Sequence, residues 1–109
     1  MQGSIRTLIE EQLERAITKH PHFADRFISP HTTYRDIRGE VSIARRNSDA
    51  ECDHHYWSVE ATLREEVAEA MEAAMNRDWT NCKQELAQVA AVCIRAIEWI
   101  TQEKYNEQN

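Results

Sequence analysis

Apolar residues recur at intervals of three and four along most of the chain, which is the spacing of amphipathic α-helices. This pattern predicts a first helix over residues 4–19, with Ser4 as its N-cap and Pro21 just beyond its end. Prolines and aromatic side chains in residues 20–33 then indicate a loop. No segment shows the sustained alternation that is typical of a β-strand.

A second helix is expected over residues 34–46, although Gly39 lowers its helical propensity. Its inward-facing positions are Ile37, Val41 and either Ile43 or Ala44. The polar residues 47–53 are expected to form a connection to the next helix.

A third helix is expected to begin after Ser58, a favourable N-cap, and to end near Asn76. Its apolar stripe consists of Leu63, Val67, Ala70, Met71 and Ala74. A fourth helix, capped by Asp78 or Asn81, is expected to end near Lys104 and to leave a frayed tail. Its apolar stripe consists of Leu86, Val89, Ala90, Cys93, Ile94, Ile97 and Ile100.

The predicted fold is therefore all-α, an antiparallel bundle of three to four helices in a single domain over residues 1–109. A domain of this length buries only a thin core. We therefore expect a homodimer or homotetramer, in which the subunits complete each other's core.

The composition, with 41% hydrophobic and 29% charged residues, is that of a soluble globular protein. The formal net charge of -6 makes binding to nucleic acid unfavourable. No apolar run is long enough to span a bilayer, and residues 1–7 lack the apolar core of a signal peptide, so no membrane partner is expected. The three cysteines have no paired spacing, which favours reduced thiols and a cytoplasmic location.

Two pairs of polar residues stand at helical spacing. Glu66 and Glu69 are three residues apart, and so are Glu85 and Gln88 on the next predicted helix. Residues at this spacing share one face of a helix. Because the turn between the two helices is short, the helices should be antiparallel and in contact, which allows the two pairs to converge.

Carboxylates that converge repel one another, and their burial without compensation is costly. A hard divalent cation such as Mg²⁺ removes this cost, because it prefers carboxylate oxygens and also accepts substrate phosphates. An ordinary solvated face is the alternative, since glutamate is common on helix surfaces. The positions of Glu66 and Glu85 beside the apolar stripes favour the metal site.

The same residues resemble a known family. EEVAE at 65–69 and ELAQ at 85–88 resemble the EExxE…ExxD signature of MazG-like nucleotide pyrophosphohydrolases, in the all-α NTP pyrophosphatase superfamily. The resemblance extends through WSVEATLREEVAEAMEA and KQELAQVAAVCIRAIEWI, so that the motif-bearing part is about 57–104. It implies a MazG-like helical fold and a hydrolase that converts nucleoside triphosphates to monophosphate and pyrophosphate, in a nucleotide-pool house-cleaning role.

Carried over by position, the resemblance implies metal ligands at Glu66, Glu69 and Glu85, with Gln88 where the signature has aspartate. Mg²⁺ is the implied cofactor, with Mn²⁺ as a substitute. The implied reaction is attack of an activated water near the α-phosphorus, for which Glu65 or Glu69 are the candidate proton acceptors.

Gln88 departs from the signature. Its amide oxygen can ligate a metal, but the side chain carries no charge, so Mg²⁺ binding should be weaker than with aspartate. Three hypotheses remain open: a working site with altered metal use, a site that binds nucleotides without turnover, and a degenerate site. The alternative function is therefore a catalytically weak helical module for nucleotide binding or protein interaction.

Further side chains are candidates for substrate binding, by stacking on a base or by contact with phosphates. They are Trp99, Lys83 and Lys104. Core packing for the tryptophan and ordinary surface charge for the lysines are the alternatives. The second helix carries a positive face, interpreted as an interface or a surface for phosphate approach, which consists of Arg35, Arg38, Arg45 and Arg46.

Overall fold

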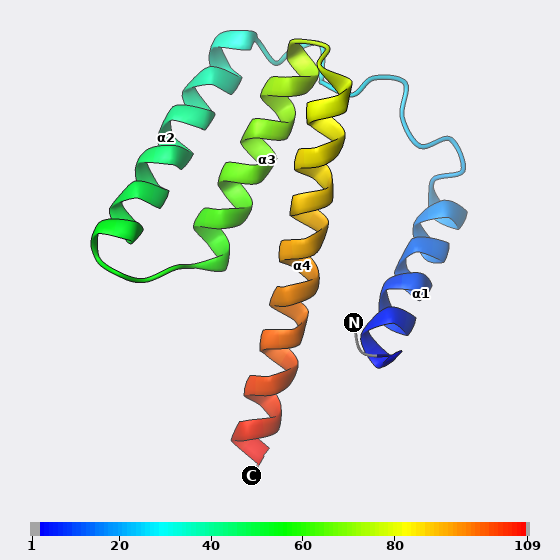
Figure 1. The fold of residues 1–109 in the computed structure, drawn as a ribbon. Helices are drawn as coiled ribbons and strands as arrows, with labels where there is room; N and C mark the ends of the chain where they lie inside the picture. The colour runs from blue at the N-terminus through cyan, green and yellow to red at the C-terminus, as the bar shows by residue number, and fades with distance from the viewer. Residues whose placement is uncertain (1–2, 109) are drawn as a thin grey trace. The chain divides into compact units, whose positions relative to one another are not determined.

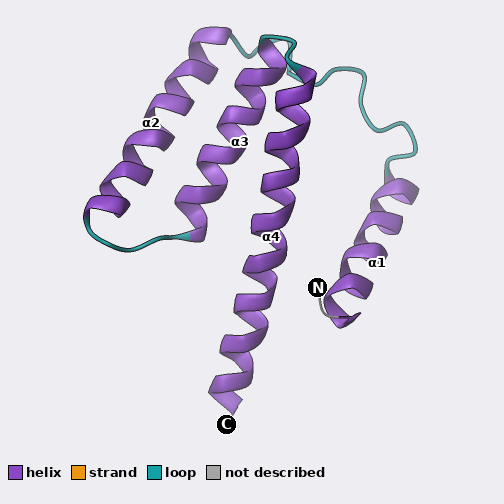
Figure 2. Cartoon of the chain, viewed as in Figure 1, coloured by secondary structure: helices purple, strands orange, loops and turns teal. Residues whose placement is uncertain are grey.

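The computed structural model describes the backbone of residues 3–108 and the side chains of residues 3–102. Over that backbone the secondary structure is entirely helical, which confirms the all-α prediction (Figure 1, Figure 2). The helices are α1 (Gly3–Lys19), α2 (Tyr34–Asp53), α3 (Val59–Met75) and α4 (Trp79–Gln108). Within the described residues, none of them combines the length and the apolar character needed to cross a membrane.

Three predicted boundaries are wrong. Helix α1 begins at Gly3, so Ser4 lies within the helix and does not cap it. Residues 47–53 belong to α2 and are not a connection, because polar side chains on the solvent face do not interrupt a helix. Helix α4 continues to Gln108 and does not end near Lys104, because the helical backbone extends beyond the end of the apolar stripe.

Side-chain caps define where α2 and α3 begin. The hydroxyl of Thr33 accepts a hydrogen bond from the Asp36 amide, and the Asp36 carboxylate accepts one from the Thr33 amide, each at 3.1 Å. The hydroxyl of Ser58 accepts from the Ala61 amide at 3.0 Å, as predicted. The backbone amide and the hydroxyl of Ser58 also donate to the carboxylate of Glu51, which ties the start of α3 to the end of α2.

The turn at residues 76–78 joins α3 to α4 in a tightly hydrogen-bonded conformation. The Arg77 amide donates to the Ala74 carbonyl at 3.0 Å, and the Asp78 amide donates to the Ala73 carbonyl at 2.9 Å. These two bonds form a Schellman motif. The Asp78 carboxylate then accepts from the backbone amide three residues further on, at 3.2 Å, and so caps α4. This short connection sets how the two helices face each other.

Replacing Arg77 by glycine is expected to raise the free energy of unfolding by about 0.5–1 kcal/mol. Arg77 has a φ of 57°, in the left-handed region where a side chain is unfavourable and glycine is usual. Denaturant unfolding of the wild type, Arg77→Gly and Arg77→Ala measures this effect, since alanine keeps the strain. A glycine variant no more stable than the alanine variant would contradict the prediction.

The chain divides into two compact units, Ile28–Cys93 and the combination of Met1–Phe27 with Ile94–Asn109. The first unit contains α2, α3 and the first half of α4. The second contains α1, whose buried residue is Ile5. Because the carboxylate pairs at 66–69 and 85–88 fall inside the first unit, that unit holds the candidate site.

Small side chains of α3 form the core of the Ile28–Cys93 unit. Ala68 packs against Ile37 and Val41 of α2, and Ala73 packs near Cys82 of α4. Alanine at helix contacts lets helix axes approach closely. The tight packing of α3 therefore rests on its alanines.

The predicted apolar stripes are only partly correct. On α2, Ala44 is buried and Ile43 is 57% exposed, which settles the alternative left open by the sequence. On α3, Val67 is 40% exposed, whereas the alanines and the partly buried Met71 and Met75 pack in the core clusters. On α4, Leu86 and Cys93 are also exposed in the single chain, and Cys82 is the buried side chain among those described, up to residue 102.

Candidate functional site

Three carboxylates from two helices converge in the Ile28–Cys93 unit. Glu66 and Glu69 lie one turn apart on α3, and Glu85 lies on α4. One carboxylate oxygen of each lies within 4.8 Å of the others. Among the described residues, this is the only group of three or more histidine, cysteine, aspartate or glutamate side chains with that spacing. We call these three residues the carboxylate cluster.

The cluster is partly removed from solvent, because all three side chains are half-buried between α3 and α4. The Oε2 atom of Glu85 is fully buried and has no hydrogen-bond partner. An unpaired buried oxygen is costly, and native proteins contain few of them.

Burial and like charge both change the protonation of the cluster. Burial, with the adjacent carboxylate of Glu85 next in importance, raises the pKa of Glu66 to about 7. Burial also raises the pKa of Glu69, and the hydrogen bond from Arg45 opposes that rise. In the absence of a cation and below about pH 7, the cluster therefore holds a proton that an exposed glutamate would already have lost.

Without divalent metal, the protein is expected to lose stability as the pH rises through about 7. The folded-state pKa of Glu66 exceeds its unfolded value, so its contribution is fully present below the unfolded pKa and is lost above the folded one. Thermal unfolding in chelator between pH 5 and 8 measures the trend, and Glu66→Gln should flatten it. An unchanged pH dependence in Glu66→Gln would contradict the prediction, with Glu60→Gln as the control for an exposed carboxylate on the same helix.

The Gln88 side chain lies directly against the Glu66 carboxylate. With its NH₂ group turned toward Glu66, which is the orientation that satisfies both groups, its nitrogen donates to Oε2 at 2.7 Å and to Oε1 at 3.2 Å. The structure thus places Gln88 beside the cluster. Its amide binds a bare carboxylate through nitrogen, whereas it can bind a cation only through oxygen.

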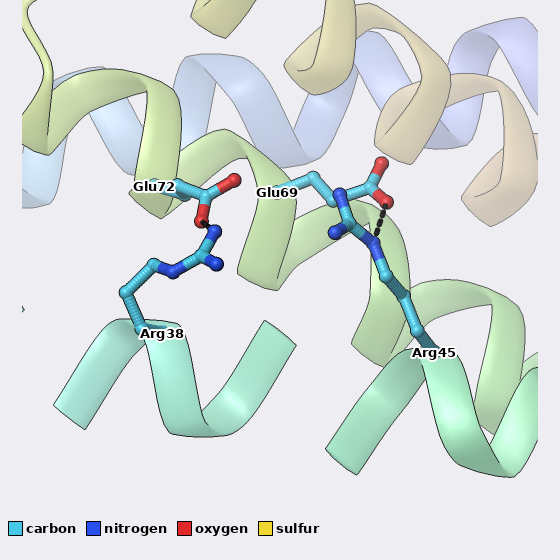
Figure 3. Close-up of polar contacts among 4 residues, drawn as sticks. All are labelled: Arg38, Arg45, Glu69 and Glu72. Carbon is cyan, nitrogen blue, oxygen red and sulfur yellow. Dashed lines mark hydrogen bonds and ion pairs between the residues drawn. The ribbon is translucent and has the colours of Figure 1, made fainter. Parts of the chain in front are cut away.

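Two arginines of α2 reach across to α3 (Figure 3). The Nε atom of Arg45 donates to Oε1 of Glu69 at 3.2 Å. Arg38 forms an ion pair with Glu72, which does not belong to the carboxylate cluster. The sequence predicted the positive face, but not these pairs, because they depend on the register between α2 and α3.

The remaining predicted site residues are Glu65, Lys83, Trp99 and Lys104. Glu65 is half-buried next to Glu66 in the chain. Its charge adds to the repulsion that raises the pKa of Glu66. Lys83 is exposed on α4, and its position two residues before Glu85 turns it about 200° around the helix from that residue. Trp99 is 62% exposed and belongs to the other unit. The side chain of Lys104 lies outside the described residues.

A separate apolar groove of about 650 Å³ lies in the same unit. Side chains of three helices line it, including Ile43 of α2, Leu63 and Val67 of α3, and Val89 and Cys93 of α4. Leu63 and Val67 lie on a different face of α3 from Glu66 and Glu69. The groove is therefore not part of the carboxylate site.

The identification of the site rests on its geometry and chemistry. The chain matches no protein-family model, no curated protein and no solved structure in the comparisons with known proteins.

Proposed function

We propose that this protein is a MazG-like, Mg²⁺-dependent pyrophosphohydrolase that converts a nucleoside triphosphate to a monophosphate and pyrophosphate. The observation that carries the proposal is the convergence of Glu66, Glu69 and Glu85 from two helices. Three half-buried carboxylates at this spacing repel one another, and a divalent cation turns that repulsion into affinity.

The residues present fit a hard cation. Every ligand atom of the cluster is an oxygen, the donor type that Mg²⁺ and Mn²⁺ prefer. The buried, unpaired Oε2 of Glu85 is available for such an ion. Gln88 can add a neutral oxygen ligand after rotation of its amide, which would break its bond to Glu66.

The proposed reaction assigns separate tasks to the carboxylates. When bound, Mg²⁺ neutralises phosphate charge and lowers the pKa of water. Glu66, Glu69 and Glu85 hold the ion and so position the triphosphate. Glu69 is also engaged by Arg45, whereas Glu65 makes no hydrogen bond or ion pair within the described residues. We therefore favour Glu65 over Glu69 as the proton acceptor for the attacking water.

Pyrophosphate release from a panel of ribo- and deoxyribonucleoside triphosphates, with Mg²⁺ or Mn²⁺, tests this function. We expect release with at least one nucleotide, and none in the presence of chelator. No release with any nucleotide, together with no thermal stabilisation by either metal, would overturn the proposal.

We also propose that the functional protein is a homodimer or homotetramer in which a second copy covers the apolar groove. Leu63 and Val67 of α3 and Val89 of α4 line that open groove, and Ile43 beside them is 57% exposed. Apolar surface of this kind commonly marks an interface. Light scattering is expected to give a multiple of 12.8 kDa, and a mass of one chain at micromolar concentration would contradict it.

The groove also favours a second candidate function, a helical interaction module whose carboxylate cluster is degenerate. That module would bind a different protein in the groove and would bind no divalent metal at the cluster. Metal binding that depends on Glu66 and Glu85 would exclude this candidate.

A further inference from the structure

Arg45 contacts the carboxylate cluster and also lines a hollow on α2 that carries two further arginines. It donates to Glu69, a member of the cluster. The hollow has a volume of about 370 Å³, and its other charged lining residues are Arg38, Arg46 and Asp49. The lining carries three arginines and one aspartate, so it is net positive in a chain whose formal net charge is -6.

The pair between Arg45 and Glu69 conflicts with cation binding. The carboxylate of Glu69 supplies one of the three oxygens that approach within 4.8 Å of one another, and Arg45 already neutralises it. A guanidinium cannot lose its charge at accessible pH. A divalent cation at the cluster would therefore compete with Arg45 for Glu69, and it would repel the guanidinium of Arg45.

A phosphate chain resolves this conflict. Its non-bridging oxygens can neutralise the cation and the guanidinium together, and the planar fork of arginine matches phosphate geometry. Arg45 is 50% exposed, so its side chain has room to turn from Glu69 toward the hollow. Arg38 and Arg46 line the same hollow and add positive charge there.

We propose that Arg45 couples cation binding to polyphosphate binding: it neutralises Glu69 in the metal-free protein and exchanges that carboxylate for a substrate phosphate once the cation is bound. The proposal rests on the function proposed above, and it identifies the substrate class at this point as a di- or triphosphate chain. It makes Arg45 a substrate-binding residue, and it makes the metal and the polyphosphate bind cooperatively.

Calorimetry on the full chain tests the coupling without any catalytic readout. Mg²⁺ is titrated alone, and pyrophosphate is then titrated with and without Mg²⁺. In the wild type, each ligand should tighten the other by a factor within the roughly 5–150-fold range of coupled sites. In Arg45→Gln, Mg²⁺ alone should bind several-fold more tightly, pyrophosphate should bind more weakly, and the coupling factor should fall toward one.

Two further variants make the test specific. Arg38→Gln removes the same charge from the same helix, but its partner Glu72 lies outside the cluster, so Mg²⁺ affinity should not change. Arg45→Lys keeps the charge but loses the fork, so Mg²⁺ affinity should stay near the wild-type value while pyrophosphate affinity falls. It also serves as the test if Arg45→Gln does not fold.

The outcomes separate this inference from the proposed function. Wild-type Mg²⁺ binding that Glu66→Gln abolishes, with no change of either affinity in the Arg45 variants, would overturn the coupling and leave the function standing. Equal increases of Mg²⁺ affinity in Arg38→Gln and Arg45→Gln would overturn it as well, because they would indicate a general charge effect. No Mg²⁺ binding by the wild type would overturn both proposals.

Discussion

Replacement of Glu85 by glutamine is expected to produce a protein that is more stable without metal and nearly inactive with it. Glu85 is the member of the cluster that α4 supplies, and its buried Oε2 has no partner. The substitution removes a carboxylate whose charge raises the pKa of Glu66, and the loss of this repulsion stabilises the metal-free fold. It also removes a proposed ligand, so activity should fall by more than the roughly 100-fold seen for outer-shell partners of metal sites.

Activity and thermal unfolding, measured on the same preparations, test both expected effects of Glu85→Gln. Pyrophosphate release should be lost in Glu85→Gln, and its thermal unfolding should no longer respond to Mg²⁺. Glu60→Gln is the matched control, because Glu60 is an exposed α3 residue paired with Arg64. It should keep wild-type activity and the wild-type response to Mg²⁺. Full activity in Glu85→Gln would exclude Glu85 as a ligand.

Replacement of Gln88 by aspartate is expected to lower the stability of the metal-free protein and to tighten Mg²⁺ binding. The metal-free protein should lose about 1–3 kcal/mol of stability, because Glu66 loses its amide donor and gains a like charge nearby. Mg²⁺ should bind more tightly, since a unit charge a few ångströms from the ion contributes about 1–4 kcal/mol in a partly solvated site. That gain corresponds to tenfold or more in affinity.

Calorimetry with Mg²⁺ and thermal unfolding with and without the metal measure both effects of Gln88→Asp. Gln88→Asn is a suitable control, because it shortens the side chain without adding charge. Weaker Mg²⁺ binding by the aspartate variant than by the wild type would contradict the expected gain and would indicate a site adapted to the neutral amide. Pyrophosphate release then shows whether tighter metal binding also raises activity.

The convergence of the carboxylates was predictable because it depends on local rules. A spacing of three residues places Glu66 and Glu69 on one face, and a short turn makes the next helix antiparallel. The caps at Ser58 and Asp78 have equally local causes, in the hydrogen bonds of a single helical turn.

Other features depend on tertiary contacts that a single sequence does not contain. The pair between Arg45 and Glu69 needs the register of α2 against α3, which the alanine contacts determine. The exposure of Val67 has the same origin, because the smaller alanines occupy the helix contacts. The left-handed conformations of His55 and Arg77 carry no sequence signal, since glycine is the residue that usually marks such turns.

The identity of the phosphate bond that the protein cleaves is the most direct test of the proposed function. Phosphorus NMR of a nucleoside triphosphate incubated with the wild-type protein and Mg²⁺ identifies the products without a coupled enzyme. We predict nucleoside monophosphate and pyrophosphate in equal amounts, and unchanged triphosphate with Glu85→Gln. Formation of nucleoside diphosphate and orthophosphate, or no Mg²⁺-dependent change in any nucleotide tested, would contradict it.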